Sequence, residues 1–318
     1  MDLRIFVEPQ QGASHATLLA VAHATADAGF SAFFRSDHLL VIGSSDGQPG
    51  PSDSWVSLAA IAARVPDIRL GTLVTSATFR HPSMLAIAVA NVDDISGGRV
   101  ELGIGTGWYE AEHRAYGIDY YSGFGERFDR LEEQLEIITG LWRTPAGQTF
   151  DYTGKFFRLE GSPGLPKPVQ SDAAGRPSVP IIIGGRGPKR TPALVARYGS
   201  EINIGYSPLP VILDYYATVR AAAEAVGRDP GELSYSTMQT LCLGRTRAEL
   251  ERRAAAIGRD PEDLVENTMS GSPAQVAEKL AHWAESGVER VYLEVLDLSD
   301  LDHIALAGAE LIPAVRSL

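Results

Sequence analysis

The chain has 318 residues, of which 44% are hydrophobic, and its 28 Lys and Arg against 40 Asp and Glu give a formal net charge of −12. This length is enough for the core of one α/β barrel, whereas the acidic balance argues against nucleic acid or an anionic membrane as a partner. No apolar run approaches the roughly 20 residues of a membrane span, the first residues lack the layout of a signal peptide, and the single cysteine excludes an internal disulfide, so we expect a cytoplasmic protein.

Short apolar runs typical of β-strands recur along the whole chain. We predict eight strands, at residues 3–7, 32–35, 68–75, 100–104, 179–183, 201–204, 234–243 and 290–295. Segments with helical periodicity alternate with them, at residues 14–28, 55–65, 82–92, 126–142, 191–198, 210–226, 246–257, 261–266, 272–283 and 303–315. Several of these helices start at a polar capping residue followed by proline, as at Ser272-Pro273.

Residues 144–179 interrupt this alternation. The segment carries five prolines and several aromatic residues, so we interpret it as an insertion before the fifth strand that contains one hairpin. The remaining alternation predicts a parallel sheet with right-handed crossovers. Eight units over this length favour a closed (β/α)8 TIM barrel, in a single domain spanning 1–318, over an open doubly wound sheet. The absence of a Gly-x-Gly-x-x-Gly motif after the first strand further weakens the open-sheet alternative.

Barrel active sites lie at the C-terminal ends of the strands, so the residues that follow each predicted strand are candidates. These are Glu8, Gln10, Ser36, Asp37, His38, Thr75 to His81, Gly105 to Trp108, Gly184 to Arg190, Gly205 to Ser207, Glu294 and Asp297. In the pair Asp37-His38, the histidine can exchange a proton near neutral pH, and the carboxylate can orient a ring. The plain structural alternative is that Asp37 caps the next segment and His38 packs at the surface.

Two glycine-rich strand ends are candidates for binding a phosphate. Gly184, Gly185 and Arg186 precede a predicted helix, whose N-terminus and backbone N–H groups favour an anion. Gly105, Thr106 and Gly107 could approach a ligand in the same way, although each segment could also be an ordinary tight turn. The seven histidines show no metal-ligand spacing, so we predict no metal site.

An ordered set of motifs resembles the bacterial luciferase-like family. The motifs are FRSDH (34–38), LGTLVT (70–75), GRVELGIGTGW (98–108) with Glu112, PIIIGGRG (180–187) and MSGSP (269–273). Within this family the chain is most similar to the branch that uses the deazaflavin coenzyme F420. The resemblance implies a (β/α)8 barrel with an insertion that binds F420, or alternatively FMN, at the strand C-termini.

The same resemblance implies roles for individual residues. Asp37 and His38 would lie at the deazaflavin, and a cis peptide in the third strand, placed at Leu73-Val74 before Thr75, would bulge behind the ring. The backbone at 105–107 and 184–186 would hold the coenzyme phosphate. Sugar-phosphate dehydrogenases of that branch carry an acidic glutamate where this chain has Trp108, which argues against such a substrate and leaves His38 as the main candidate proton donor.

These observations predict an F420-dependent oxidoreductase that transfers a hydride between the coenzyme and a small organic substrate. His38 and Asp37 would be the catalytic residues, and the segments 43–54 and 144–179 would cover the substrate. The nearest alternative is an FMN-dependent monooxygenase using reduced flavin and O2, followed by a cofactor-free barrel aldolase or isomerase and a flavin carrier without catalysis. The family resemblance also implies a homodimer.

Overall fold

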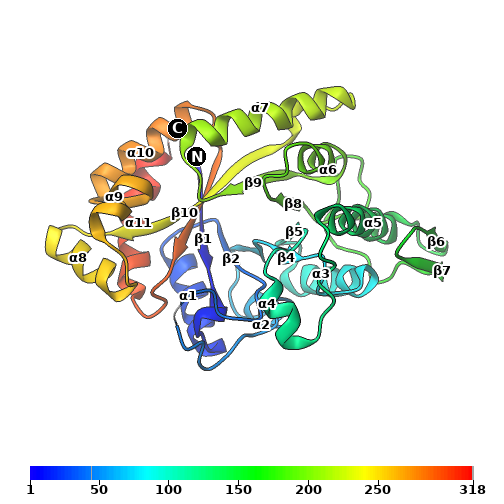
Figure 1. The fold of residues 1–318 in the computed structure, drawn as a ribbon, viewed down its shortest axis with the longest axis horizontal. Coiled ribbons are helices and arrows are strands. Elements are labelled where there is room, and N and C mark those ends of the chain that lie inside the picture. The colour runs from blue at the N-terminus through cyan, green and yellow to red at the C-terminus, as the bar shows by residue number, and fades with distance from the viewer. Residues whose placement is uncertain (44, 317–318) are drawn as a thin grey trace.

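A computed structural model of the chain describes residues 1–43 and 45–316, and within these residues eight parallel strands close into a barrel surrounded by helices (Figure 1). The barrel strands are β1 (Asp2–Val7), β2 (Ala32–Arg35), β3 (Arg69–Thr72) with its short continuation β4 (Thr75–Ser76), β5 (Val100–Gly105), β8 (Ile181–Gly184), β9 (Glu201–Gly205), β10 (Ser234–Leu243) and β12 (Arg290–Val295). Each pairs with the next, and β12 pairs with β1. The predicted (β/α)8 barrel is therefore confirmed.

The helices start and end largely where the sequence signals predict. They are α1 (His15–Asp27), α2 (Ser54–Ala62), α3 (Pro82–Ser96), α4 (Glu110–Tyr116), α5 (Phe124–Arg143), α6 (Arg190–Tyr198), α7 (Leu209–Ala225), α8 (Arg247–Ala256), α9 (Pro261–Asn267), α10 (Pro273–Glu285) and α11 (Leu301–Val315), with short 3-10 turns at Pro9–Gln11 and Pro230–Glu232. Ser14 caps α1 by accepting the Thr17 N–H, and Ser272 forms a capping box with Gln275 at α10. None of the helices in the described ranges is long and apolar enough to cross a membrane.

Some predicted boundaries differ from the observed ones. The predicted strand 68–75 is interrupted between β3 and β4, where Leu73-Val74 is a cis peptide bond at the predicted position. The N-cap of α6 is Lys189 rather than Thr191. The prediction also missed α4 and the short strand β11 (Met269–Gly271), which pairs with β10 outside the barrel, because both are too short to show a clear period.

The segment 144–179 contains the expected hairpin, β6 (Phe150–Thr153) and β7 (Arg158–Ser162), which pair antiparallel. The hairpin lies at the outer edge of the molecule beside α5 (Figure 1). Gly140 of α5 allows this contact, because a methyl group there would lie 2.3 Å from the Phe150 ring. The insertion therefore packs on the outside of the barrel against α5.

Strand periodicity sorts the barrel interior into layers. Successive side chains point to opposite faces of a strand, so every second residue of β12 faces inward. Arg290, Tyr292 and Glu294 thus lie at the bottom, middle and top of the barrel. The middle layer is apolar, with Phe6, Ala32, Phe34, Leu73, Ile182 and Tyr292 packed together.

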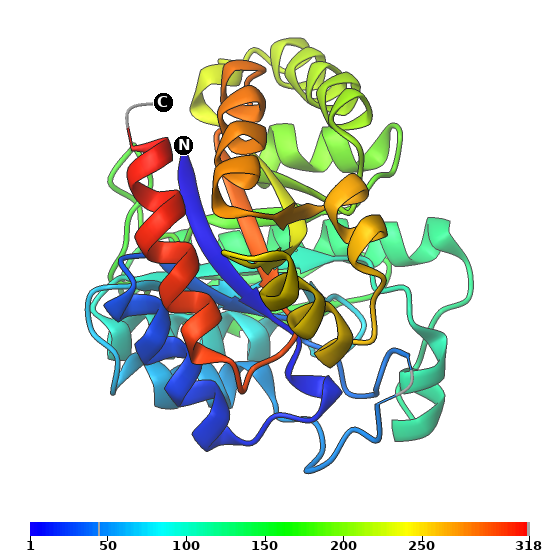
Figure 2. The same ribbon diagram turned by 90° about the vertical axis from the view of Figure 1, so that its left-hand side faces the viewer.

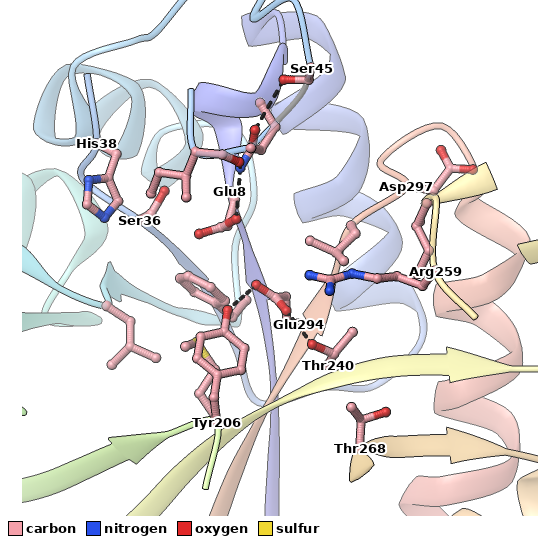
Figure 3. Close-up of a pocket in the computed structure, with 18 of the residues that line it drawn as sticks. Glu8, Ser36, His38, Ser45, Tyr206, Thr240, Arg259, Thr268, Glu294 and Asp297 are labelled. Atoms are coloured by element: carbon pink, nitrogen blue, oxygen red, sulfur yellow. Dashed lines mark hydrogen bonds between the residues drawn. The ribbon is translucent and has the colours of Figure 1, made fainter. Parts of the chain in front are cut away.

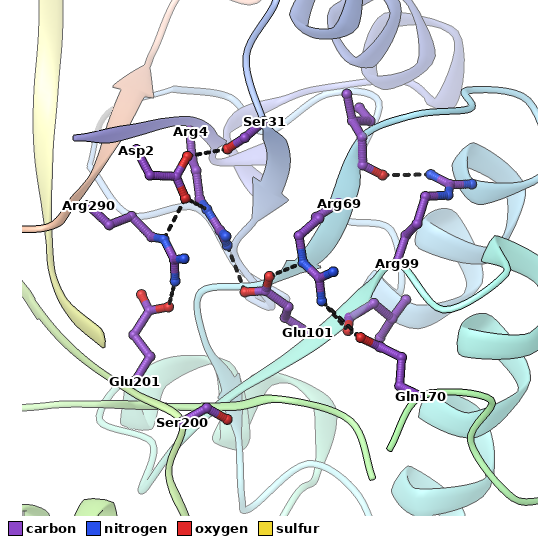
Figure 4. A network of polar contacts seen from close by, with 12 residues as sticks. Asp2, Arg4, Ser31, Arg69, Arg99, Glu101, Gln170, Ser200, Glu201 and Arg290 are labelled. Carbon is purple, nitrogen blue, oxygen red and sulfur yellow. Dashed lines mark hydrogen bonds and ion pairs between the residues drawn. The ribbon is translucent and has the colours of Figure 1, made fainter. Parts of the chain in front are cut away.

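The bottom layer is a network of charged side chains from five strands (Figure 4). Arg4 on β1 donates to Glu101 on β5 at 2.6 Å, and Arg69 on β3 binds the same carboxylate. Arg290 on β12 pairs with Asp2 and with Glu201 on β9. The two chain ends also meet at this end of the molecule (Figures 1 and 2), where the Met1 amino group donates to the Val315 carbonyl oxygen at 3.3 Å.

Candidate active site

A cavity of about 1,400 Å³ opens at the C-terminal ends of the barrel strands. Its floor is apolar and formed by Phe6, Leu73, Val74 and Met238, which belong to or pack against the middle layer of the barrel. Polar side chains from the strand ends surround this floor (Figure 3). The volume exceeds that of a typical pocket for one drug-sized ligand.

The residues predicted to act in catalysis or to bind the coenzyme divide into two groups. Asp37, His38, Leu73, Val74 and Gly107 line the cavity. The remaining predicted residues lie next to this lining rather than in it, and they are Thr75, Gly105, Thr106, Gly184, Gly185 and Arg186. Two segments were predicted to cover the substrate. In the first, 43–54, Gly43 and Ser45 line the cavity, while Ser44 lies outside the described residues. Among the described residues none of 144–179 lines the cavity, so the prediction that this insertion covers the substrate is wrong.

Asp37 is buried and held by an arginine rather than by the neighbouring histidine. Arg80 donates to both Asp37 carboxylate oxygens and to Asp53. Burial lowers the pKa of the Arg80 guanidinium, but the carboxylates of Asp37 and Asp53 outweigh burial and raise it above its usual value. Because Asp37 is fixed in this ion pair, it anchors the strand end instead of orienting the His38 ring.

The group that orients His38 is Glu112, on α4. His38 Nδ1 lies 3.1 Å from both carboxylate oxygens of Glu112, and the Leu39 N–H donates to Glu112 Oε2 at 2.9 Å. A carboxylate accepts hydrogen bonds only, so Nδ1 carries the proton and Nε2 is left as the ring atom available to a ligand. In the sequence Glu112 stands only at the end of a motif, and no local signal marks this role.

Trp108 forms an exposed aromatic edge of the cavity. It is 58% exposed and stacks on Tyr109 with ring centroids 5.3 Å apart. The His38 ring meets the Trp108 ring edge-on at 5.7 Å. The aromatic pair therefore flanks His38 at the rim and does not belong to the core.

Glycines on neighbouring strands make room for Val74. A methyl group on Gly184 would lie 2.9 Å from Val74 Cγ1, and one on Gly105 would lie 3.1 Å from Val74 Cγ2. Gly107 has a positive φ of 77°, and a methyl group there would lie 2.2 Å from Ser76 Oγ. These positions need glycine for local packing, in addition to any approach of a ligand to the backbone.

The segment after β8 presents backbone and basic side chains near the start of α6. Gly185 has a φ of 129°, a conformation that favours glycine, and Arg186 donates to Ser207 Oγ at 3.1 Å. Arg190 forms ion pairs with Asp129 and Glu132 of α5. Of the basic residues here, Arg186 and Lys189 are therefore better placed than Arg190 to meet an anion.

A second polar group lies across the cavity from His38 (Figure 3). Glu294 on β12 is 3% exposed, and it accepts hydrogen bonds from the Tyr206 hydroxyl and, at 2.6 Å, from the Thr240 hydroxyl. Burial and the nearby Glu8 carboxylate raise the pKa of Glu294 to about 7. Burial and Glu294 also raise the pKa of Tyr206. Tyr206 has a φ of 49°, which is uncommon for a residue with a side chain and places its ring over the cavity.

The junction between α8 and α9 completes this side of the cavity. It contributes residues from 256 to 264, among them Arg259 and Asp263. No motif identified these residues, because they approach the strand ends only through the packing of two short helices. Across the described residues, no group of three or more His, Cys, Asp or Glu side chains is arranged to hold a metal ion.

Comparisons with known proteins agree with this architecture. The family model for luciferase-like monooxygenases matches residues 1–260. An F420-dependent hydroxymycolic acid dehydrogenase of Mycobacterium tuberculosis is 32% identical over 229 residues, which cover 68% of this chain and 56% of that protein's length. An F420-dependent glucose-6-phosphate dehydrogenase of Segniliparus rotundus is 26% identical over 91% of each chain.

A solved structure has the same fold over the whole chain. The F420-dependent secondary alcohol dehydrogenase in complex with an F420-acetone adduct superimposes with a TM-score of 0.82 at 18% identity, covering 99% of both chains. Barrel, strand-end cavity and sequence match together assign the chain to an enzyme family: it belongs to the luciferase-like monooxygenase family.

Proposed function

We propose that the protein is an F420-dependent oxidoreductase that transfers a hydride between the deazaflavin coenzyme and a small organic substrate. The observation that carries the proposal is the His38–Glu112 pair, which leaves a histidine nitrogen free beside a cavity with an apolar floor. Relatives named for F420-dependent dehydrogenation support it. When bound, the coenzyme supplies a ring that accepts or donates the hydride.

The residues present fit such a coenzyme. Leu73 and Val74 offer an apolar surface at the cavity floor for a flat ring. The backbone of 105–107 and of the two glycines 184–185 lies beside it, with Arg186 and the start of α6 on the same side of the barrel. Backbone N–H groups, a helix N-terminus and a cation together favour the coenzyme phosphate.

His38 would move the proton that accompanies the hydride. Glu112 keeps the proton on Nδ1 in the neutral ring, so Nε2 takes a proton from a substrate hydroxyl when the substrate is oxidised and returns it in the reverse direction. The resulting imidazolium is stabilised by the buried Glu112 carboxylate, which is 1% exposed. Asp37 acts indirectly, by fixing the strand end that carries His38.

An FMN-dependent monooxygenase that uses reduced flavin and O2 is the second candidate, favoured by the family description. Both coenzymes carry a flat tricyclic ring, a flavin in FMN and a deazaflavin in F420. The tail of F420 is the longer and more anionic of the two. The exposed Arg186 and Lys189 beside the ring site suit the longer anionic tail of F420.

Titration of the purified protein with F420 and with FMN, followed by fluorescence, tests the proposal. We expect tighter binding of F420, and we expect Arg186→Ala to weaken it about fivefold or more while leaving binding of the tail-less deazaflavin chromophore unchanged, because the lost charge faces the phosphate. Arg158→Ala, on the outer hairpin, serves as the matched control and should change neither affinity. Tighter binding of FMN would overturn the proposal.

Three further expectations belong to the proposal and stay predictions. These are that the chain forms one domain, that the enzyme is cytoplasmic, and that it is a homodimer. Light scattering coupled to size-exclusion chromatography tests the last, with twice the mass of one chain as the expected result.

A further inference from the structure

The charges that line the cavity are unevenly distributed. Six carboxylate side chains line it, and within the described part of the chain Arg259 is the one Lys or Arg among the lining residues; the carboxylates are Glu8, Asp37, Glu112, Asp263, Glu294 and Asp297. Asp37 is paired with Arg80, and Glu112 accepts a hydrogen bond from the His38 ring. Glu8 and Glu294 lie on the other side of the cavity, where their hydrogen-bond partners are the neutral side chains of Gln11, Tyr206 and Thr240.

We call Glu8, Tyr206, Thr240 and Glu294 the carboxylate wall. Figure 3 shows Glu8 and Glu294 facing the same space, with Tyr206 on one side and Arg259 on the other. Tyr206 and Thr240 donate both of their hydroxyl hydrogen atoms to Glu294, so these hydroxyls offer a ligand only lone pairs. Glu8 accepts one hydrogen bond, from Gln11 at 3.3 Å, and its carboxylate has acceptor capacity left.

We infer that the carboxylate wall selects the substrate by charge, and that the cavity takes a neutral or cationic substrate with hydroxyl or ammonium donors in preference to a phosphate ester or a carboxylate. The identification of the ligand as the substrate rests on the proposed function. The proposed site of the coenzyme phosphate lies after β5 and β8, whereas the wall is built from the ends of β1, β9, β10 and β12.

The wall would act through its hydrogen-bond acceptors and through charge repulsion. A wall that presents acceptors and negative charge binds donors, and it repels a second anion in a cavity of reduced dielectric constant. Arg259 is exposed, and among the described residues on this side of the cavity it is the one arginine beside four lining carboxylates, Glu8, Asp263, Glu294 and Asp297. It therefore reduces the net negative charge of the lining without reversing its sign. Burial and the Glu8 charge disfavour the ionised form of Glu294 and raise its pKa to about 7, so Glu294 adds its full negative charge to the wall only above that pH.

Three probes of one shape separate the possibilities: benzylamine, benzyl alcohol and benzoate. Binding to the full chain is measured through the fluorescence of Trp108 at the cavity rim, with Trp108→Phe to subtract the other three tryptophans. We expect benzylamine and benzyl alcohol to bind about fivefold or more tightly than benzoate. The double variant Glu8→Gln with Glu294→Gln should remove most of this preference, whereas Glu285→Gln, an exposed acid on α10, should leave it unchanged.

The outcomes decide the inference independently of the coenzyme. Benzoate binding as tightly as the other probes, a preference that survives the double variant, or no binding of any probe would each overturn it. Each titration is run on the chain alone and again with F420 added. Failure of F420 to bind contradicts the proposed function but leaves the probe order on the chain alone to judge the wall. F420 binding together with a preference for benzoate contradicts only the inference.

Discussion

At the scale of single residues, Glu112 determines what His38 can do. The two residues are 74 positions apart in the chain, and α4 brings the buried carboxylate to Nδ1 of the ring. The carboxylate accepts the Nδ1 hydrogen and thereby fixes which nitrogen faces a ligand. The adjacent Asp37, the more obvious partner in the sequence, is occupied by Arg80.

Glu112→Gln should therefore impair proton transfer without impairing coenzyme binding. The amide can still accept from Nδ1, but the charge that stabilises the imidazolium is gone. We expect kcat to fall about 10- to 100-fold, part of the roughly 10²- to 10⁴-fold that acid–base catalysis contributes, with less than about a twofold change in F420 affinity. Glu110→Gln, an exposed acid on the same helix, is the control. Unchanged kcat and an unchanged pH profile in Glu112→Gln would show that Glu112 is only structural.

At the scale of elements, the close packing of β3, β5 and β8 shapes the cavity floor. A methyl group on Gly103 of β5 would lie 1.9 Å from the Thr72 carbonyl oxygen of β3, and Thr72 donates its hydroxyl to the Gly103 carbonyl at 2.8 Å. The clash with the Thr72 carbonyl oxygen is with the backbone, so no side-chain rotation can relieve it. Glycine at position 103 is thus required by the approach of two strands.

Gly103→Ala should destabilise the fold by at least about 1–3 kcal/mol, the usual cost of overpacking a core. Gly125→Ala is the matched control, because Gly125 lies at the start of α5 with no atom within 4 Å of the added methyl group. It should be as stable as the wild type, or more stable by up to about 1 kcal/mol because alanine favours helix. Urea unfolding of both variants measures the difference, and equal midpoints would contradict the packing argument.

At the scale of the whole molecule, the charged network at the bottom of the barrel links the first and last strands, β1 and β12, to β3, β5 and β9 through ion pairs. Glu101 is buried between Arg4 and Arg69. Burial alone raises the pKa of Glu101, but these arginines outweigh it and hold that pKa below its usual value. Buried ion pairs add little net stability, yet removing one partner is costly because the other charges stay buried.

Glu101→Gln should reduce the free energy of unfolding by about 3–5 kcal/mol at neutral pH. A carboxyl whose pKa is lowered by folding contributes stability above its unfolded-state pKa, and that contribution is lost as the pH falls through the folded-state value. The difference between wild type and variant should therefore shrink as the solution is acidified. Glu160→Gln, which breaks an exposed pair with Arg158, should change stability by less than about 1 kcal/mol at any pH. A pH-independent difference would contradict this role for Glu101.

Much of the barrel was predictable because its signals are local. The strands at 234–243 and 290–295 coincide with β10 and β12, and proline and serine mark the start of α10. The errors arise where local signals are weak or where distant parts meet. A hairpin within 144–179 was predicted and lies at 150–162, but only its contact with Gly140 shows that it packs on α5 rather than over the cavity.

The sequence alone determined the alternation of strands and helices, hence the barrel, and the position of Asp37 and His38 at the end of the second strand. Only the tertiary structure decided that Glu112 rather than Asp37 meets the His38 ring, and that Glu8, Tyr206 and Glu294 form one wall. The reason is physical: periodicity and caps act between residues a few positions apart, whereas the site joins side chains from different strand ends, whose distances are fixed only when the barrel closes.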